Sequence, residues 1–427
     1  MSHKEIKHCS FCGIDQSVSV PLIAGADGYI CGACVLLAHQ VVTNWSRKKE
    51  LAQMQGDLPK PAKIKAHLDQ YVIGQHLAKE ILAVAVYNHY KRLKHESGDA
   101  GLGEFDKDVE IGKSNILLIG PSGTGKTLLA STLAKIVGVP FVVADATTLT
   151  QAGYVGDDVE NILVRLLDVA EGNIANAEWG IVYLDEIDKI ARSPEQQTGT
   201  RDVSGEGVQQ ALLRLVEGSH VKLPAKGHRN KDGGDTLMDT RNILFIAGGS
   251  FPGLEKYVEK RLVPTNSAIG FHAAVDQGTE KPSLEDMLNA TQPSDLRKFG
   301  LIPEFIGRFP VLAPLEPLDV DALIQVLTEP KNALVKQYQQ LFAYEGVELM
   351  FEQDALVEIA KKAIERETGA RGLRSIMEQI LRKTMFDIPS VDDVEQCVID
   401  ADVVNGAGDI RLIKKDDDKR RQQAGQS

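Results

Sequence analysis

The sequence predicts an α/β protein whose main domain is a parallel β-sheet that binds phosphate. A smaller, mainly helical domain follows this sheet, and a zinc-binding module precedes it. Three observations support this prediction: a glycine-rich loop between an apolar strand and a helix, an apolar run that ends in two carboxylates, and two cysteine pairs near the N-terminus. Apolar runs near residues 116, 141, 181, 243 and 311 alternate with helical patterns, which is typical of a parallel sheet.

Length and charge limit the classes of protein to consider. The chain has 427 residues, too many for one compact core, so two to four domains are expected. A net charge of −12 disfavours a nucleic-acid-binding surface as the main function. No apolar run is long enough for a membrane span, and the first residues do not resemble a signal peptide. We therefore expect a cytoplasmic protein with neither a membrane nor a nucleic acid as partner.

Four of the five cysteines are arranged as two Cys-x-x-Cys pairs with zinc-site spacing: Cys9, Cys12, Cys31 and Cys34. Two disulfides are the alternative, which a reducing compartment disfavours. Four thiolates complete the zinc coordination and leave no open position for chemistry, so the module is expected to bind another molecule. The fifth, Cys397, is expected to be a buried apolar side chain.

The glycine-rich loop has the sequence NILLIGPSGTGKT and spans residues 115–127. In such a loop, backbone N–H groups and the start of the next helix bind phosphates. Lys126 is expected to reach the β- and γ-phosphates, and the Thr127 hydroxyl to hold Mg²⁺. The alternative is a chance glycine-rich turn, which the order of strand, motif and helix disfavours. The predicted nucleotide contacts are Gly120, Pro121, Ser122, Gly123, Thr124, Gly125, Lys126, Thr127 and Leu128.

The second half of the predicted site is the run IVYLDEID, residues 181–188. Successive strand residues face opposite ways, so carboxylates at the end of the strand can have separate roles. Asp185 is expected to hold the Mg²⁺ shell and Glu186 to polarise the attacking water. The alternative is a solvated acidic pair.

Three apolar groups lie in polar or glycine-rich surroundings, and each allows two interpretations. Tyr71, Val72 and Ile73 line an adenine pocket or pack under the next helix. Tyr154 lies between glycines, which weaken both helix and strand, so it is presented to a partner or folds back on the core. The triplet of residues 269–271, within a polar insertion, needs a covering partner or packs locally.

Further along the chain, Gly138 is expected to end the helix after the loop, and Asp157 to cap the helix that follows. The expected domains are a zinc-binding module at 1–50, a linker at 51–62, a large ATPase domain at 63–314, a small domain at 315–414, and a disordered tail at 415–427.

With these pieces placed, the chain resembles the ClpX family of AAA+ unfoldases over nearly its whole length. The motifs that carry the resemblance are, in order, CxxC-CxxC, GPSGTGKT, GYVG, YLDEIDK, TRDVSGEGVQQALL, IGF, PEFIGR and GARGLR. The resemblance implies an AAA+ domain with a small AAA+ domain and a treble-clef-like zinc domain that binds substrates or adaptors. It also implies a homohexamer that uses ATP, Mg²⁺ and Zn²⁺, unfolds tagged proteins brought directly or by adaptors, and threads them into a ClpP-type peptidase.

The resemblance also implies roles for single residues. Arg308 looks like the arginine finger that reaches the γ-phosphate of the neighbouring subunit, and Arg371 like the sensor arginine. Tyr71, Val72 and Ile73 would lie by the adenine. Tyr154 and Val155 would form the pore loop that grips substrate, and Ile269, Gly270 and Phe271 the loop that docks on the peptidase. For Arg308, the alternative is an ordinary surface ion pair.

One departure concerns the pore entrance. The family has an Arg-Lys-His triplet where this chain has Gly227-His228-Arg229-Asn230, so recognition of degradation tags is expected to differ. Three other functions share some of these motifs: a remodelling chaperone without a peptidase, a nucleic-acid motor, and a non-catalytic scaffold. A motor would show salt-sensitive DNA binding, which the acidic charge disfavours; intact Glu186 and Arg308 argue against a scaffold.

Overall fold

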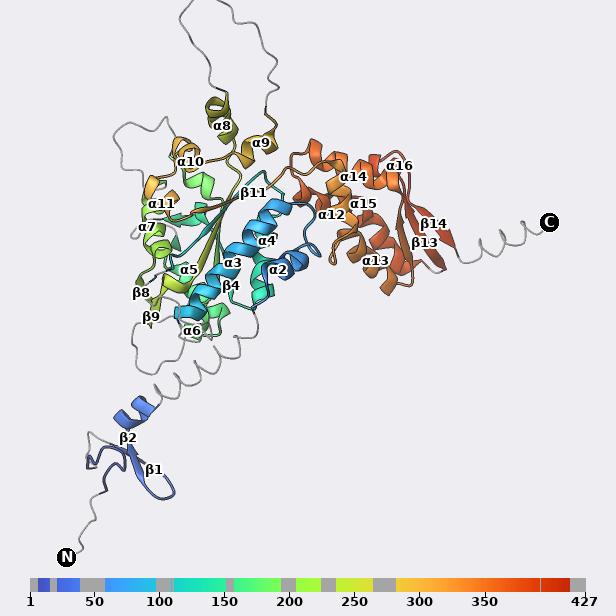
Figure 1. Cartoon of the computed structure of the whole chain (residues 1–427). Helices are drawn as coiled ribbons and strands as arrows, with labels where there is room; N and C mark the ends of the chain where they lie inside the picture. Colours follow the sequence, from blue (N-terminus) through green and yellow to red (C-terminus); the bar gives the residue numbers. More distant parts are fainter. Residues whose placement is uncertain are drawn as a thin grey trace, which may run out of the picture. The chain divides into compact units, whose positions relative to one another are not determined.

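The computed structural model describes residues 7–15, 21–38, 58–96, 109, 111–150, 157–192, 205–223, 236–263, 282–391 and 393–414 (Figure 1). The chain divides into two compact units, Met1–Leu58 and Pro59–Ser427. No helix in the described ranges has both the length and the apolar character needed to cross a bilayer.

The first unit is a small β-hairpin followed by a helix. Strands β1 (Leu22–Ala24) and β2 (Tyr29–Cys31) pair antiparallel, and residues 32–38 are helical. The first cysteine pair is tied to the hairpin, because the Ser10 N–H donates to the Tyr29 carbonyl at 2.8 Å. Among the described residues of this unit, only Cys9 and Cys31 are buried. Because the described residues bury so little apolar surface, they need another source of stability, as small metal-binding modules do.

A five-stranded parallel sheet forms the centre of the second unit, as predicted. Its order is β11-β3-β10-β7-β4, and every neighbouring pair is parallel. All five predicted strands are confirmed, with bounds β3 (Ile116–Ile119), β4 (Phe141–Asp145), β7 (Ile181–Asp185), β10 (Leu244–Gly249) and β11 (Val311–Pro314). Because the strands are parallel, their carboxyl ends meet at one edge of the sheet, which is where ligands bind in such folds.

Helices surround this sheet; Figure 1 shows α3 and α4 crossing one of its faces. The helices of this domain are α2 (Pro61–Leu68), α3 (His76–Glu96), α4 (Lys126–Val137), α5 (Asn161–Val169), α6 (Ile174–Ala177), α7 (Glu206–Glu217), α8 (Leu254–Leu262), α9 (Leu284–Asn289), α10 (Pro293–Phe299) and α11 (Pro303–Gly307). Short strand pairs add β5 (Leu149–Thr150) with β6 (Asp157–Asp158), and β8 (His220–Leu223) with β9 (Thr236–Asp239). Helix α2 begins inside the range predicted as a linker, with Pro61 in its first turn, where the missing N–H costs nothing.

One predicted helix boundary is confirmed and one is wrong. Gly138 ends α4 in the left-handed conformation, with φ +76°, and its N–H donates to the Ala134 carbonyl at 2.8 Å. Asp157 does not cap the next helix, because it lies in β6, paired with Leu149, and Glu160 occupies the N-cap of α5. The strand pairing displaces the start of the helix along the chain.

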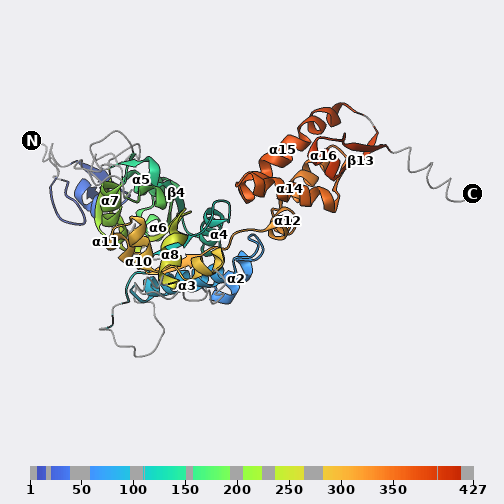
Figure 2. The same cartoon turned by 90° about the horizontal axis from the view of Figure 1, so that it is seen from above.

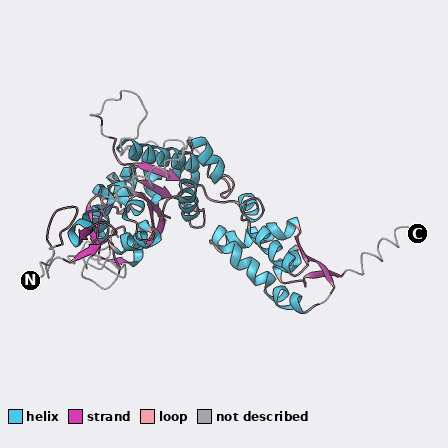
Figure 3. Cartoon of the chain, turned by 90° about the horizontal axis from the view of Figure 1, so that it is seen from below, coloured by secondary structure: helices cyan, strands magenta, loops and turns pink. Residues whose placement is uncertain are grey.

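The C-terminal part of the second unit is a separate, mainly helical domain with its own hydrophobic core. Figures 2 and 3 show its helices together with a small sheet. Its elements are α12 (Val320–Thr328), α13 (Leu334–Tyr344), β12 (Glu348–Phe351), α14 (Gln353–Glu365), α15 (Ala370–Asp387), β13 (Val394–Ile399), α16 (Ala401–Asn405) and β14 (Arg411–Lys414). Cys397 is fully buried in this core, as predicted.

Candidate functional site

The glycine-rich loop connects the end of β3 to the start of α4 at the carboxyl edge of the sheet. Gly123 and Gly125 have φ of +78° and +96°, conformations that side chains other than glycine rarely adopt. The loop closes around the ammonium group of Lys126, which donates to the carbonyls of Gly120 at 2.7 Å and Pro121 at 2.8 Å. The first N–H groups of α4 have no partner within the helix and can bind an anion.

Lys126 is prepared for an anionic ligand by its burial. Only 8% of the residue is exposed, and this burial lowers the pKa of the ammonium to about 8, against the opposing effect of the Asp185 charge. Phosphate oxygens beside Lys126 would favour its charged form. The loop therefore fits a triphosphate, both in its N–H donors and in its charge.

Thr127 and Asp185, the two predicted Mg²⁺ residues, are brought together by the fold. The Thr127 hydroxyl donates to Asp185 Oδ2 at 3.0 Å, across the gap between the start of α4 and the end of β7. The Tyr183 hydroxyl donates to the other carboxylate oxygen, Oδ1, at 3.4 Å. Mg²⁺ in nucleotide sites takes one or two protein oxygens together with phosphates and water, so this pair fits the ion.

Glu186 follows directly but leaves the strand conformation. Its φ is +55°, in the left-handed region, and its N–H donates to Asp185 Oδ1 at 3.0 Å. A non-glycine residue in this region costs of order 1–3 kcal/mol and is common at active sites. The turn places two adjacent carboxylates in different backbone conformations beside the loop, as separate roles require.

Arg371 reaches this site from the smaller domain. It lies in the first turn of α15, as predicted, and its guanidinium is 4.0 Å from Asp185 Oδ2. The start of α15 also touches the loop, because the Ala370 N–H donates to the Gly123 carbonyl at 3.3 Å. A Cβ on Gly123 would lie 2.6 Å from the Thr368 carbonyl oxygen. The phosphate loop and the smaller domain therefore contact each other directly.

Arg308 belongs to a different part of the surface. It is the residue after α11, and its guanidinium pairs with Glu217 of α7 at 2.6 Å. Both side chains are substantially exposed, 51% and 39%, so the pair contributes only about 0–1 kcal/mol to stability. The single chain thus contains the surface ion pair considered above, and the same exposure leaves Arg308 accessible to a second molecule.

Tyr71 and Val72 of the predicted adenine group lie in different surroundings. Val72 is buried beside the loop, where a Cβ on Gly125 would lie 3.8 Å from its side chain. The Tyr71 ring stacks on His67, with ring centroids 5.5 Å apart. The Lys79 side chain is buried, and its ammonium group fixes the backbone at Val72 by donating to the Val72 carbonyl at 2.6 Å.

The four predicted zinc cysteines form one cluster. Their sulfur atoms all lie within 4.8 Å of one another, and tetrahedral Zn–S bonds of about 2.3 Å need separations of about 3.8 Å. Burial raises the pKa of Cys9, but hydrogen bonds from the N–H groups of Cys12, Cys31 and Phe11 outweigh it, and the pKa falls to about 6. The hydrogen bond with Cys12 raises the pKa of Cys34 to about 12. Four cysteine sulfurs that converge at this spacing are the donor set of a structural zinc site, so the cluster fits zinc.

Removing zinc is expected to unfold the first unit and leave the second intact. Metal binding supplies about 10–16 kcal/mol in small zinc modules, and the described residues of this unit bury little else. Cys12→Ser should lower the zinc content and make the first unit sensitive to protease, while ATP binding persists. Cys397→Ser, at a buried cysteine outside the cluster, is the control and should keep the zinc. A protected first unit after complete chelation would contradict this role of the metal.

Several predicted residues lie outside the described ranges. They are Tyr154, Val155, Ile269, Gly270, Phe271 and the stretch Gly227-His228-Arg229-Asn230. Their assigned roles therefore remain predictions.

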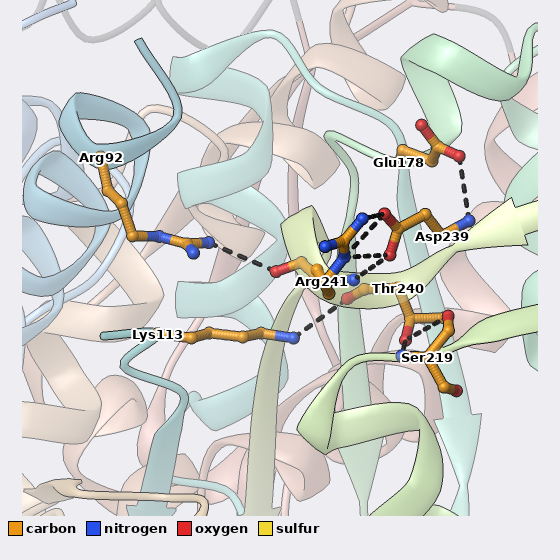
Figure 4. Close-up of polar contacts among 7 residues, drawn as sticks. All are labelled: Arg92, Lys113, Glu178, Ser219, Asp239, Thr240 and Arg241. Atoms are coloured by element: carbon orange, nitrogen blue, oxygen red, sulfur yellow. Dashed lines mark hydrogen bonds and ion pairs between the residues drawn. The ribbon is translucent and has the colours of Figure 1, made fainter. Parts of the chain in front are cut away.

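Sequence reasoning missed a buried polar network at the base of the β8–β9 hairpin (Figure 4). Lys113 donates to the carbonyls of Thr240 at 3.1 Å and Val216 at 3.2 Å, and burial lowers its pKa to about 7. Arg92 donates to the Arg241 carbonyl at 3.3 Å. Nothing in the local sequence marks these residues, because their partners lie more than 100 positions away.

The chain is similar to known proteins along most of its length. Residues 7–44 match the ClpX C4-type zinc finger family, residues 112–312 the AAA domain (Cdc48 subfamily) family, and residues 318–399 the C-terminal D2-small domain of ClpB protein. The chain is 66% identical over 416 residues to the ATP-dependent Clp protease ATP-binding subunit ClpX 3 of Methylococcus capsulatus, covering 96% of this chain and 95% of that protein. It is 56% identical over 392 residues to the ATP-dependent Clp protease ATP-binding subunit ClpX of Azotobacter vinelandii, covering 92% and 88%.

Proposed function

Because the chain belongs to the ClpX family, we propose that it is an ATP-dependent protein unfoldase and translocase, the ATP-binding subunit of a Clp protease. It acts as a cytoplasmic homohexamer that threads tagged or unfolded proteins into a ClpP-type peptidase. The observation that carries the catalytic part of this proposal is the 3.0 Å hydrogen bond between Thr127 and Asp185, made beside Lys126 and Glu186. This arrangement supports ATP hydrolysis rather than a purely structural use of the nucleotide.

The catalytic roles follow from this geometry. Lys126 and the loop N–H groups bind the phosphates, and Val72 lies on the side of the loop where the adenine is proposed to bind. Thr127 and Asp185 hold Mg²⁺, which neutralises charge on the phosphates when bound. Glu186 orients the attacking water and accepts its proton. Arg308 completes the site of the neighbouring subunit.

Coupling to movement is proposed to run through the smaller domain. Arg371 and the backbone around Ala370 contact the loop and its acidic partner, so a change of nucleotide alters contacts of both domains. Domain closure and opening of this kind is a common way to convert ligand state into motion. In the hexamer this motion would move Tyr154 and Val155 along the pore.

Partner binding is assigned to two further parts of the chain. The zinc module has no open metal position, and its described surface exposes Phe11, Ile23 and Leu37, which suits binding of substrates or adaptors. Ile269, Gly270 and Phe271 are proposed to dock on the peptidase. The different pore-entrance stretch of residues 227–230 is proposed to change tag preference.

The test is a folded, tagged reporter incubated with the full chain and ATP. Tyr154→Ala should keep ATP hydrolysis within about two- to threefold of the parent and lose most unfolding, because a pore aromatic transmits force without touching nucleotide. The control is Tyr344→Ala, at a tyrosine 75% exposed on α13, which should unfold the reporter normally. Unchanged unfolding by Tyr154→Ala would reject the pore-loop role.

Adding a ClpP-type peptidase to the same assay separates the two protein-remodelling functions. Degradation of the reporter only with peptidase supports the protease partnership. Unfolding that never leads to degradation would favour a remodelling chaperone without a peptidase. DNA-stimulated, salt-sensitive ATP hydrolysis would instead favour the nucleic-acid motor.

A further inference from the structure

The helix that precedes Arg308 is too short to fix this residue by itself. Helix α11 has five residues, Pro303–Gly307, and an isolated helix of this length has no stability of its own in water. Its position must therefore come from contacts with the rest of the domain. Phe305 in the helix and Phe309 just after it supply apolar contacts, because both belong to the main hydrophobic core of the domain and are at most 1% exposed.

Two buried carboxamides hold the two ends of this helix. At its C-terminal end, the Asn115 side chain donates to the Arg308 carbonyl at 2.8 Å and accepts from the Phe245 N–H at 3.2 Å. At its N-terminal end, the Gln209 side chain accepts from the Ile302 N–H at 2.8 Å and donates to the Ile190 carbonyl at 2.7 Å.

Both side-chain amides are buried, and each one uses its N–H donor as well as its carbonyl oxygen acceptor. Asn115 is 2% exposed and Gln209 is not exposed at all, so each lost hydrogen bond would leave a buried group without a partner. A carboxamide fixed at both its oxygen and its nitrogen has little freedom to move. Asn115 directly precedes β3, the strand that leads into the phosphate loop, and Gln209 lies on α7, which also carries Glu217.

We infer that Asn115 and Gln209 are positioning residues that fix the backbone around Arg308 for its action on the neighbouring subunit. The inference rests on the proposed function, because it requires Arg308 to act across a subunit interface. The Arg308–Glu217 ion pair, by contrast, lies at the solvent-exposed surface, where such a pair contributes only about 0–1 kcal/mol. The backbone is therefore held firmly while the guanidinium can exchange Glu217 for a phosphate.

The experiment measures ATP hydrolysis by the full chain with Asn115→Ala or Gln209→Leu. Misplacing a catalytic group by about 1 Å costs up to roughly 100-fold, so kcat should fall by about 10- to 100-fold. The Kd of a fluorescent ATP analogue should stay within about twofold, because binding uses the subunit's own loop. Damage to the loop itself would weaken nucleotide binding instead.

Mixed rings give the decisive result. A subunit with Asn115→Ala keeps its own catalytic groups, and a subunit with Glu186→Gln keeps its own finger. Mixing the two in equal amounts should restore hydrolysis to about a quarter of the parent rate, since about half of the first type then receive a correctly placed finger. Gln209→Leu should be restored in the same way.

Two controls keep the possible failures apart. Arg308→Ala mixed with Glu186→Gln must also regain activity; if it does not, the cross-subunit role of Arg308 fails, and with it that part of the proposed function. Gln75→Leu removes another buried carboxamide, which is bonded to the backbone of Glu316 instead of to α11. Any loss of ATP hydrolysis that this variant shows should not be restored by mixing.

If Arg308→Ala is restored but neither Asn115→Ala nor Gln209→Leu is, the two amides act within their own subunit and the inference is overturned. The same holds if either variant weakens nucleotide binding as much as it lowers kcat. Thermal unfolding of each variant identifies one that has lost its fold, and the other variant then decides.

Discussion

Glu186→Gln is expected to lower ATP turnover by about 10²- to 10⁴-fold while ATP stays bound, since this is the range that one general base contributes. The substitution keeps the size of the side chain and removes its ability to accept a proton. The hydrogen bonds of Lys126 to the loop and of Thr127 to Asp185 do not involve the Glu186 side chain. Turnover and affinity should therefore separate cleanly.

The matched control for this variant is Glu171→Gln. Glu171 is an exposed glutamate with the same φ of +55°, so the two substitutions share residue type and backbone conformation but not location. Glu171→Gln should hydrolyse ATP at the parent rate. Single-turnover hydrolysis and equilibrium binding of ATP measure the two quantities. Near-parent turnover by Glu186→Gln would remove this residue as the base.

Much of the fold was predictable because each central strand is an apolar run next to a recognisable boundary. The runs at Ile116 and Ile181 end in the phosphate loop and the acidic pair, and both lie in the parallel sheet as predicted. Placing these two strand ends at one edge needs only the parallel arrangement. The meeting of Thr127 with Asp185 was therefore expected from the two motifs and the parallel arrangement of their strands.

The parts that could not be predicted depend on contacts between distant residues. Asn115 and Arg308 are 193 positions apart, and no property of an asparagine before a strand shows which carbonyl it will meet. The left-handed backbone conformation of Glu186 also cannot be recognised from the local sequence, because glutamate rarely adopts it. Asp157 shows the opposite failure: its capping pattern was convincing locally, but pairing with Leu149 took precedence.

Arg308→Ala is expected to produce the largest loss of turnover, about 10³- to 10⁵-fold, because an arginine supplied by a neighbour stabilises charge that develops only in the transition state. Stability should change little, since the ion pair with Glu217 is exposed and contributes about 0–1 kcal/mol. ATP affinity should change much less than kcat.

Arg411→Ala is the control that separates the two roles of a surface arginine. Arg411 is 56% exposed and pairs with Glu352 at 2.5 Å, so it closely matches the 51% exposure and 2.6 Å pair of Arg308. If Arg308 does no more than pair with Glu217, both variants will retain most of their hydrolysis, and the finger assignment fails. A large loss in Arg308→Ala alone would mean that losing an exposed surface ion pair does not explain the effect, because Arg411→Ala removes a pair of similar length and exposure.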